Sequence, residues 1–201
     1  MKKIIYIVIT VVVLLSIVLY VVFNNKSKVS NSSLNSDKKI LVVYYSAQGH
    51  TDKVSSYILD NLDADVFQVE PINDYSSSDL NYNDRNSRVY KEYSDESLRN
   101  IPLKNTNVDN WDIYDIVFIG YPIWWGVAAW PINNFVKNNN FDGKTVIPFC
   151  TSASSGVGDS VNKLKSYGNT GDWLDGYRFS SSASNDDVKN WLEELKNKNI
   201  I

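Results

Sequence analysis

The stretch that most constrains the fold is Lys39–Thr51, KILVVYYSAQGHT. Its apolar, β-branched and aromatic run Ile40–Tyr45 predicts a strand that is buried on both faces. A short turn, Ser46–His50, follows this run. From Thr51 onward apolar residues recur at helical spacing, at Val54, Tyr57, Ile58 and Leu62. The stretch therefore predicts a strand joined to a helix by a loop of small residues.

The loop between this strand and this helix has the chemistry to hold an anion. A helix N-terminus offers unpaired N–H groups and partial positive charge, and hydroxyl side chains add further donors. Gly49 would let the backbone approach an anion closely. The same residues also suit an ordinary connection in which Thr51 caps the helix, and the loop alone does not decide between the two.

Composition sets limits on the class of protein. A length of 201 residues suits one domain, the single Cys150 excludes an intramolecular disulfide, and the single histidine excludes a multi-histidine metal site. Sixteen of the 20 basic side chains and all 23 acidic ones lie from Asp37 onward, a formal charge of −7. An acidic body argues against nucleic acid and anionic lipid as partners. It suits docking to basic partner proteins, although it is also what a solvated surface looks like.

The N-terminal region predicts a membrane anchor. Ile4–Phe23 holds no charged residue, and a helix of this length spans about 30 Å, the thickness of a bilayer core. A cleaved signal peptide is the alternative, but the run exceeds the usual ~7–15 apolar residues and no A-x-A-like site follows it. Lysines flank both ends, and this leaves only a slight preference for a body on the extracytoplasmic side. We therefore expect an anchor at 1–23, a flexible Ser/Asn-rich tether at 24–37 and a globular domain at 38–201.

Strand and helix patterns alternate through the rest of the chain. The expected strands are Asp65–Glu70, Ile113–Tyr121, Thr145–Phe149 and a weak one within Trp173–Phe179. The expected helices are one within Leu80–Leu98, one from Pro131, Asp159–Tyr167 and a last one capped by Ser184 and Asp187. This alternation predicts a parallel sheet with helices on both faces.

Three loops follow buried strands, at Ser46–Thr51, Pro122–Trp130 and Cys150–Gly158. Loops at the carboxyl ends of parallel strands lie along one edge of the sheet, where ligands bind at a reversal of strand order. One loop suits phosphate, one carries three tryptophans around a glycine, and one is rich in Ser, Thr and Gly. Together they suit a planar aromatic ligand with a phosphate tail. Trp124 and Trp125 favour a ligand wall over core packing, whereas Tyr82, Tyr90 and Tyr93 fit either helix packing or a lid.

The sequence resembles the flavodoxin family, in the branch marked by YPIWWG and PFCTS. The residues that carry the resemblance extend from Lys39 to about Lys198 and include YYSAQGHT, YDIVFIGYPIWWG, FDGKTVIPFCTSASSGVG and WLDGYRFS. The resemblance implies an α/β, flavodoxin-like, doubly wound five-stranded parallel sheet of order 2-1-3-4-5 with FMN at the switch point. Flavodoxin itself is the type example of this rule.

The resemblance also implies which residues bind the cofactor. In the family the first loop wraps the FMN phosphate, and the loops after the third and fourth strands border the ring. The implied cofactor-binding residues are Ser46, Ala47, Gln48, Gly49, His50, Thr51, Pro122, Ile123, Trp124, Trp125, Gly126, Thr151, Ser152, Ala153, Ser154 and Gly156. The family's usual first loop is S/T-x-T-G-N-T. Here Gln48 replaces a threonine and His50 an asparagine, and both can still donate hydrogen bonds.

We therefore expect a membrane-tethered, FMN-binding electron-transfer protein that docks to basic redox partners. One alternative is an FMN-dependent NAD(P)H:quinone oxidoreductase. Another is a flavodoxin-fold binding module without FMN. Cys150 is expected to be a buried, unreactive thiol, because reactive thiols need an exposed, electropositive setting.

Overall fold

A parallel β-sheet of strand order β2-β1-β3-β5-β6 is the framework of the computed structural model, which describes residues 38–201. The strands of this path are β1 (Ile40–Tyr44), β2 (Asp65–Gln68), β3 (Ile116–Trp124), β5 (Thr145–Ser152) and β6 (Asp172–Trp173). The chain places β2 on one side of β1 and β3 on the other, so the strand order reverses between β1 and β3. The predicted parallel α/β sheet is confirmed.

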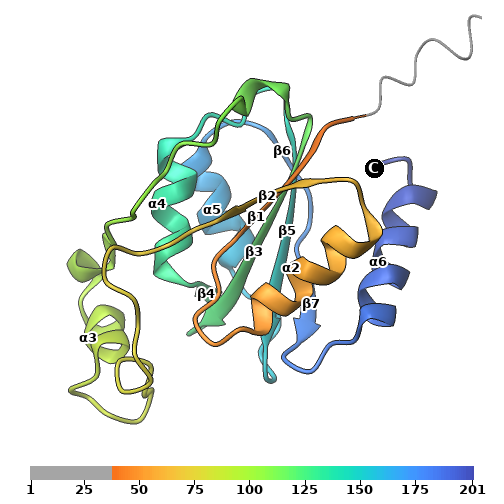
Figure 1. The fold of residues 1–201 in the computed structure, drawn as a ribbon. Helices are drawn as coiled ribbons and strands as arrows, with labels where there is room; N and C mark the ends of the chain where they lie inside the picture. The colour runs from red at the N-terminus through yellow and green to blue at the C-terminus, as the bar shows by residue number, and fades with distance from the viewer. Residues whose placement is uncertain (1–37) are drawn as a thin grey trace, which may run out of the picture. The chain divides into compact units, whose positions relative to one another are not determined.

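Two layers of helices cover this sheet (Figure 1). On one face lie α2 (His50–Asn61) and α6 (Asn185–Asn197), whose buried residues form a core with β-strand residues such as Phe118 and Phe149. On the other face lie α4 (Trp130–Asn138) and α5 (Ser160–Gly168), over a second core that contains Val117 and Ile119. The central strands are therefore apolar throughout, because both of their faces are buried.

The end of the sheet differs from the expected five strands in two ways. The fifth position is divided between β6 and β7 (Tyr177–Ser180), which both pair with β5 in parallel. In addition, β4 (Val127–Ala128) pairs antiparallel with the end of β3. The expectation of a loop over Pro122–Trp130 is therefore wrong in part. β3 continues to Trp124, and the segment turns back as a β-hairpin.

A long connection, residues 69–115, joins β2 to β3. It contains α3 (Arg88–Ser94) and two short helical turns, η1 (Glu96–Arg99) and η2 (Trp111–Ile113). The helix predicted within Leu80–Leu98 exists but is limited to α3. The Ser87 hydroxyl caps α3 by accepting a hydrogen bond from the Tyr90 N–H at 3.3 Å. Figure 1 shows α3 standing apart from the four helices that cover the sheet.

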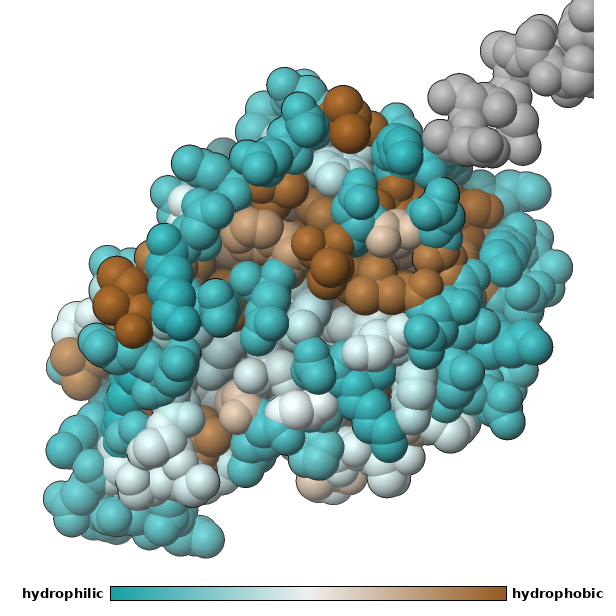
Figure 2. Space-filling model, viewed as in Figure 1, coloured by the Kyte–Doolittle hydropathy of each residue, from teal (hydrophilic) through white to brown (hydrophobic). Residues whose placement is uncertain are grey.

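β2 forms one edge of the sheet, and its side chains are partly exposed. Val66 is 52% exposed, and Figure 2 shows apolar surface in the region where β2 lies. The strand is short and begins with the charged Asp65, and both features discourage edge-to-edge pairing with another chain.

Within residues 38–201 no helix has both the length and the apolar character needed to cross a bilayer. The predicted anchor at 1–23 and the tether at 24–37 lie outside the described residues.

Candidate functional site

A cavity of about 430 Å³ lies at the carboxyl ends of β1, β3 and β5, where the strand order reverses. All the predicted cofactor residues line it except Gly49, Gly126 and Gly156. Two further serines line the cavity: Ser155, which lies within the predicted third loop, and Ser181, which the sequence did not single out. Residues 100 positions apart in the chain thus meet at one place, which is the place where doubly wound sheets bind ligands.

The first loop has the geometry of an anion site. Gly49 is the N-cap of α2 with φ at 84°, in the left-handed region that favours glycine, and no side chain among residues 38–201 caps this helix. The alternative in which Thr51 caps α2 is therefore wrong. Thr51 lies inside the first turn, and its buried hydroxyl is 2.8 Å from that of Thr151. The N–H groups of this uncapped first turn stay available to a ligand, because a helix supplies no acceptors for them.

The Ser46 hydroxyl is suited to form a hydrogen bond with a ligand. Its Oγ is buried, lines the cavity region and has no hydrogen-bond partner within residues 38–201. A buried hydroxyl without a partner costs about 1–3 kcal/mol, and an oxygen-rich acceptor would remove this cost. The donors of the first loop thus fit a phosphate, the charged end of FMN.

The tip of the β3–β4 hairpin presents Trp125 at the other side of the cavity. Trp125 has φ at 46° and Gly126 has φ at 78°, which is unfavourable for a bulky residue such as tryptophan. Aromatic contacts hold Trp125: Tyr93 stacks on its ring at 4.4 Å with an 11° interplanar angle, and the Tyr82 ring lies 4.9 Å away. Of the three tyrosines that fitted either packing or a lid, Tyr82 lines the cavity and all three contact Trp125.

Trp124 belongs both to the core and to the cavity wall, which the sequence analysis treated as alternatives. It lines the cavity, yet it is only 1% exposed and packs edge-on against Tyr45 and Tyr75. Trp124 is therefore a core residue that forms part of the cavity wall, whereas the partly buried Trp125 contacts tyrosines of the long connection.

The hairpin tip is tied to the start of α5. The Asp159 N–H donates to the Gly126 carbonyl at 3.1 Å. Gly158 has φ at 59°, and a Cβ added there would lie 2.3 Å from the same carbonyl oxygen. Only glycine fits at 158, so the close approach of two backbones fixes where the Trp125–Gly126 turn sits.

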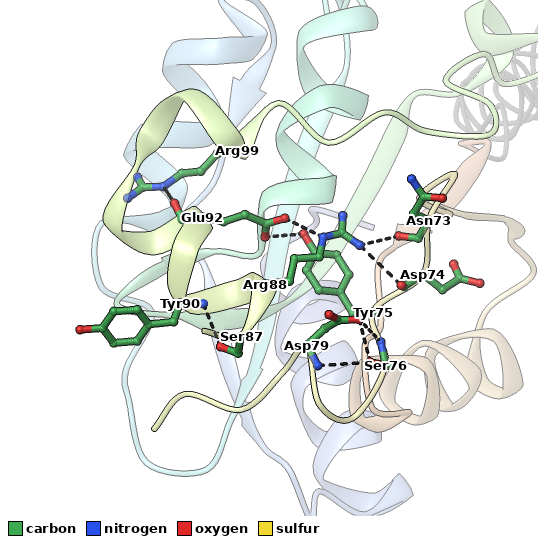
Figure 3. Close-up of polar contacts among 10 residues, drawn as sticks. All are labelled: Asn73, Asp74, Tyr75, Ser76, Asp79, Ser87, Arg88, Tyr90, Glu92 and Arg99. Atoms are coloured by element: carbon green, nitrogen blue, oxygen red, sulfur yellow. Dashed lines mark hydrogen bonds and ion pairs between the residues drawn. The ribbon is translucent and has the colours of Figure 1, made fainter. Parts of the chain in front are cut away.

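A buried polar cluster supports the aromatic wall from behind (Figure 3). Glu92 is 4% exposed and accepts hydrogen bonds from the Tyr75 hydroxyl at 2.7 Å and from Arg88 Nε at 2.8 Å. The Arg88 guanidinium also lies 3.8 Å from the centre of the Tyr75 ring. Burial and the hydrogen bond to Glu92 raise the pKa of Tyr75, so its phenol stays neutral and acts as a donor.

Sequence reasoning missed this cluster. Arg88 and Glu92 have the i, i+4 spacing of many exposed helical pairs, and nothing in the sequence indicates that the carboxylate is buried.

The third loop begins inside β5, which continues to Ser152. Arg178 of β7 holds it by donating from Nη2 to the Ser152 carbonyl at 2.9 Å and to the Ala153 carbonyl at 3.0 Å. Sequence analysis did not identify Arg178. Cys150 is fully buried in β5, and burial raises the pKa of its thiol to about 12, against a smaller opposing effect of the Arg178 charge. The expectation of a buried, unreactive thiol agrees with this setting.

The sheet order, the switch-point cavity and the anion-suited first loop define a doubly wound α/β protein that binds a ligand at its carboxyl edge. The chain belongs to the flavodoxin family: the family model described as Flavodoxin matches residues 39–195.

Solved structures agree with this family. A candidate flavoprotein from Bacteroides eggerthii DSM 20697 is 34% identical, with a TM-score of 0.70, over 80% of this chain and 99% of that one. A second, from Bacteroides uniformis ATCC 8492, is also 34% identical, with a TM-score of 0.71, over 78% and 98%. A flavoprotein from Lactobacillus acidophilus NCFM, solved in complex with FMN, is 23% identical with a TM-score of 0.51, over 77% and 99%. No curated protein matches this chain.

Proposed function

We propose that this chain is an FMN-dependent electron-transfer protein held at a membrane by its N-terminal segment. The observation that carries the proposal is the switch-point cavity, in which the unpartnered Ser46 hydroxyl and the uncapped start of α2 face the same space as Trp125. Membership of the flavodoxin family and the FMN complex of the Lactobacillus acidophilus flavoprotein support FMN as the cofactor.

Each part of the cavity has a role in this proposal. Ser46, Gln48, His50 and the α2 N–H groups hold the phosphate, and the Thr51–Thr151 pair joins the phosphate side to the ring side. Trp125, Pro122 and Thr151–Ser154 border the ring and the ribityl chain. When bound, FMN supplies the redox chemistry, while the protein sets its potential and access.

The acidic body has a predictable effect on that potential. From Asp37 onward the formal charge is −7. Added negative charge in the cavity is disfavoured by this field, and the apolar wall of Trp124 and Trp125 strengthens the effect by limiting solvation. Both features favour a low reduction potential, and the negative charge also favours docking to basic partner proteins.

The membrane part of the proposal comes from the sequence. Ile4–Phe23 would span the bilayer, and the 24–37 tether has a random-coil reach of about 20 Å. Such a tether keeps the cavity close to the membrane surface, where electrons pass to or from a membrane-embedded partner. We place the body on the extracytoplasmic side.

An equilibrium reductive titration of the full chain, purified in detergent and reconstituted with FMN, tests the function. Two separated one-electron steps in the visible spectrum support the electron carrier. Rapid NAD(P)H turnover with quinones identifies an oxidoreductase instead, and a chain that cannot bind FMN identifies a binding module.

The topology has a separate test. Protease added to intact, wall-stripped cells should digest the body while the membrane is still closed. If the body stays full length until the membrane is permeabilised, it faces the cytoplasm and the proposed orientation is wrong.

A further inference from the structure

A second cavity, of about 160 Å³, lies between α4, α5 and η1, outside the cofactor site. Its walls carry three cationic side chains, Arg99 of η1, Lys137 of α4 and Lys163 of α5, and one acidic residue, Glu96. Its lining also includes Trp130 at the start of α4. Figure 1 shows α4 and α5 side by side on one face of the sheet, with the long connection passing beside α4. We call this cavity the α4–α5 groove.

Trp130 is the observation that points to a ligand. It is only 1% exposed, and its Nε1–H has no hydrogen-bond partner within residues 38–201. Nearly all buried polar groups in native proteins are paired, and Trp130 lines the groove, so an acceptor bound in the groove is the candidate partner for its unpaired indole N–H. Indole N–H is a donor only, and therefore the missing partner carries an acceptor atom.

The cationic side chains around Trp130 indicate that the acceptor is an anion. The Arg99 guanidinium lies 4.6 Å from the centre of the Trp130 ring. Arginine has five N–H groups, and three of those of Arg99 donate to the Glu92 carbonyl, the Tyr93 carbonyl and Glu96 Oε1. Two N–H groups therefore remain as donors. Arg99 can therefore donate to a ligand without losing the contacts that hold it in place.

The two lysines add charge that the described part of the chain does not neutralise. Neither Lys137 nor Lys163 forms an ion pair within residues 38–201, and Lys137 lies over the Tyr167 ring at 4.5 Å. Glu96, the only acid among the described residues that line the groove, is 80% exposed and is paired with Arg99 at 2.6 Å. A concentration of positive charge on an otherwise acidic body is an anion-selective feature.

We propose that the α4–α5 groove binds a small anion that carries a carboxylate or a phosphate, which accepts from Trp130 Nε1–H and Arg99 and is neutralised by Lys137 and Lys163. The groove, at about 160 Å³, is much smaller than the cofactor cavity of about 430 Å³, so it suits a small anion. The proposal does not depend on FMN, because none of these groups lines the cofactor cavity.

The test follows the indole N–H signals of the ¹⁵N-labelled full chain in detergent micelles, with Trp130→Phe identifying the Trp130 signal among the six tryptophans. Inorganic phosphate and succinate are the probes, titrated at an ionic strength held constant with sodium chloride. We expect the Trp130 signal to shift saturably, with a dissociation constant in the millimolar range, for at least one probe. A response to phosphate alone or to succinate alone tells which anion the groove accepts.

Variants that each remove one charge test whether the groove residues bind the anion. Lys137→Gln and Lys163→Gln should each weaken binding about two- to fivefold, the range measured for exposed charge pairs. Glu96→Gln should tighten binding, because it removes the one opposing charge. Lys165→Gln, on an exposed position of α5 that does not line the groove, should change nothing.

The proposal fails if neither probe shifts the Trp130 signal, if sodium chloride alone produces the same shift, or if Lys165→Gln weakens binding as much as Lys163→Gln does. A second readout covers the case in which Trp130→Phe does not fold. Phosphate or succinate should raise the melting temperature of the parent chain at constant ionic strength, and Lys163→Gln should reduce that rise. Equal stabilisation of both chains would also overturn the proposal.

Discussion

The hydroxyl of Thr51, in the first turn of α2, lies 2.8 Å from the hydroxyl of Thr151, near the end of β5. Both residues are buried and both line the cofactor cavity. One hydroxyl donates to the other, so the pair retains one O–H that can be donated to a ligand. This contact links the first turn of α2 to the end of β5 across the cavity.

The first prediction concerns this pair. Thr51→Val should weaken FMN binding about ten- to hundredfold, the effect of losing one charge-assisted hydrogen bond of about 1.5–3 kcal/mol. Riboflavin, which lacks the phosphate, should lose much less affinity in the Thr51→Val variant. When Thr151→Val is added to that variant, the further loss of FMN affinity should be smaller than the loss that Thr151→Val causes in the parent chain. Isothermal titration of both flavins measures this. Equal losses for FMN and riboflavin would mean that the loop does not hold phosphate.

The second prediction separates two tryptophans. Trp125→Ala should weaken FMN binding with little effect on stability, because Trp125 is partly exposed and lines the cavity. Trp191→Ala is the matched control: Trp191 is 4% exposed in the α6 core, and its loss should lower the free energy of unfolding by about 3–5 kcal/mol. Urea titrations and FMN dissociation constants compare the two. The same FMN affinity in both variants would contradict the assigned ring wall.

The third prediction concerns Gly158. Gly158→Ala should displace the hairpin tip and weaken FMN binding, because its new Cβ would overlap the Gly126 carbonyl. Gly143→Ala is the control, with φ at 74° and, among the described residues other than its chain neighbours, no heavy atom within 4 Å of the added Cβ. Both variants pay about 1 kcal/mol for a left-handed alanine, so any difference reports the overlap. If the two bind FMN alike, the contact between Gly158 and Gly126 does not position the turn.

The fourth prediction concerns the buried cluster in Figure 3. Glu92→Gln should lower the free energy of unfolding by about 3–5 kcal/mol, because it leaves the Arg88 charge without its buried partner. Glu96→Gln should change it by less than about 1 kcal/mol, because the Glu96 side chain that pairs with Arg99 is 80% exposed. Denaturant midpoints give both values. Similar small changes would show that the Arg88–Glu92 pair behaves as a surface pair.

The fifth prediction concerns Cys150. Burial raises the pKa of its thiol from 9.0 to about 12, so iodoacetamide should label the folded chain much more slowly than the urea-unfolded chain at pH 8. The raised pKa has a consequence for stability. Below the pKa of the unfolded chain the thiol is protonated in both states, so it has no effect on how stability changes with pH. Above that pKa the unfolded chain loses the thiol proton first, so the free energy of unfolding falls as pH rises from about 9 to about 12. Cys150→Ala should flatten that part of the pH dependence.

Much of this architecture could be predicted from the sequence because it follows local patterns. The run Ile40–Tyr45 and the strand before Gly120 are apolar on both faces, and this specifies central parallel strands. The Ser184–Asp187 capping box and the inward positions of α6 were found for the same reason, since caps and helical periodicity act over a few residues. The positions of the three cavity loops then follow from the topology alone.

Contacts between distant segments decided the rest. Pro122–Trp130 became a hairpin because β3 continues beyond Tyr121 and pairs with Val127 and Ala128. Three further contacts join residues that no spacing rule relates. They are the hydrogen bond between Thr51 and Thr151, the burial of Glu92 against Arg88 and Tyr75, and the hydrogen bonds from Arg178 to the third loop. Side-chain identity specifies local structure through steric and hydrogen-bonding preferences, whereas burial and the choice of partner depend on which surfaces the folded chain brings together.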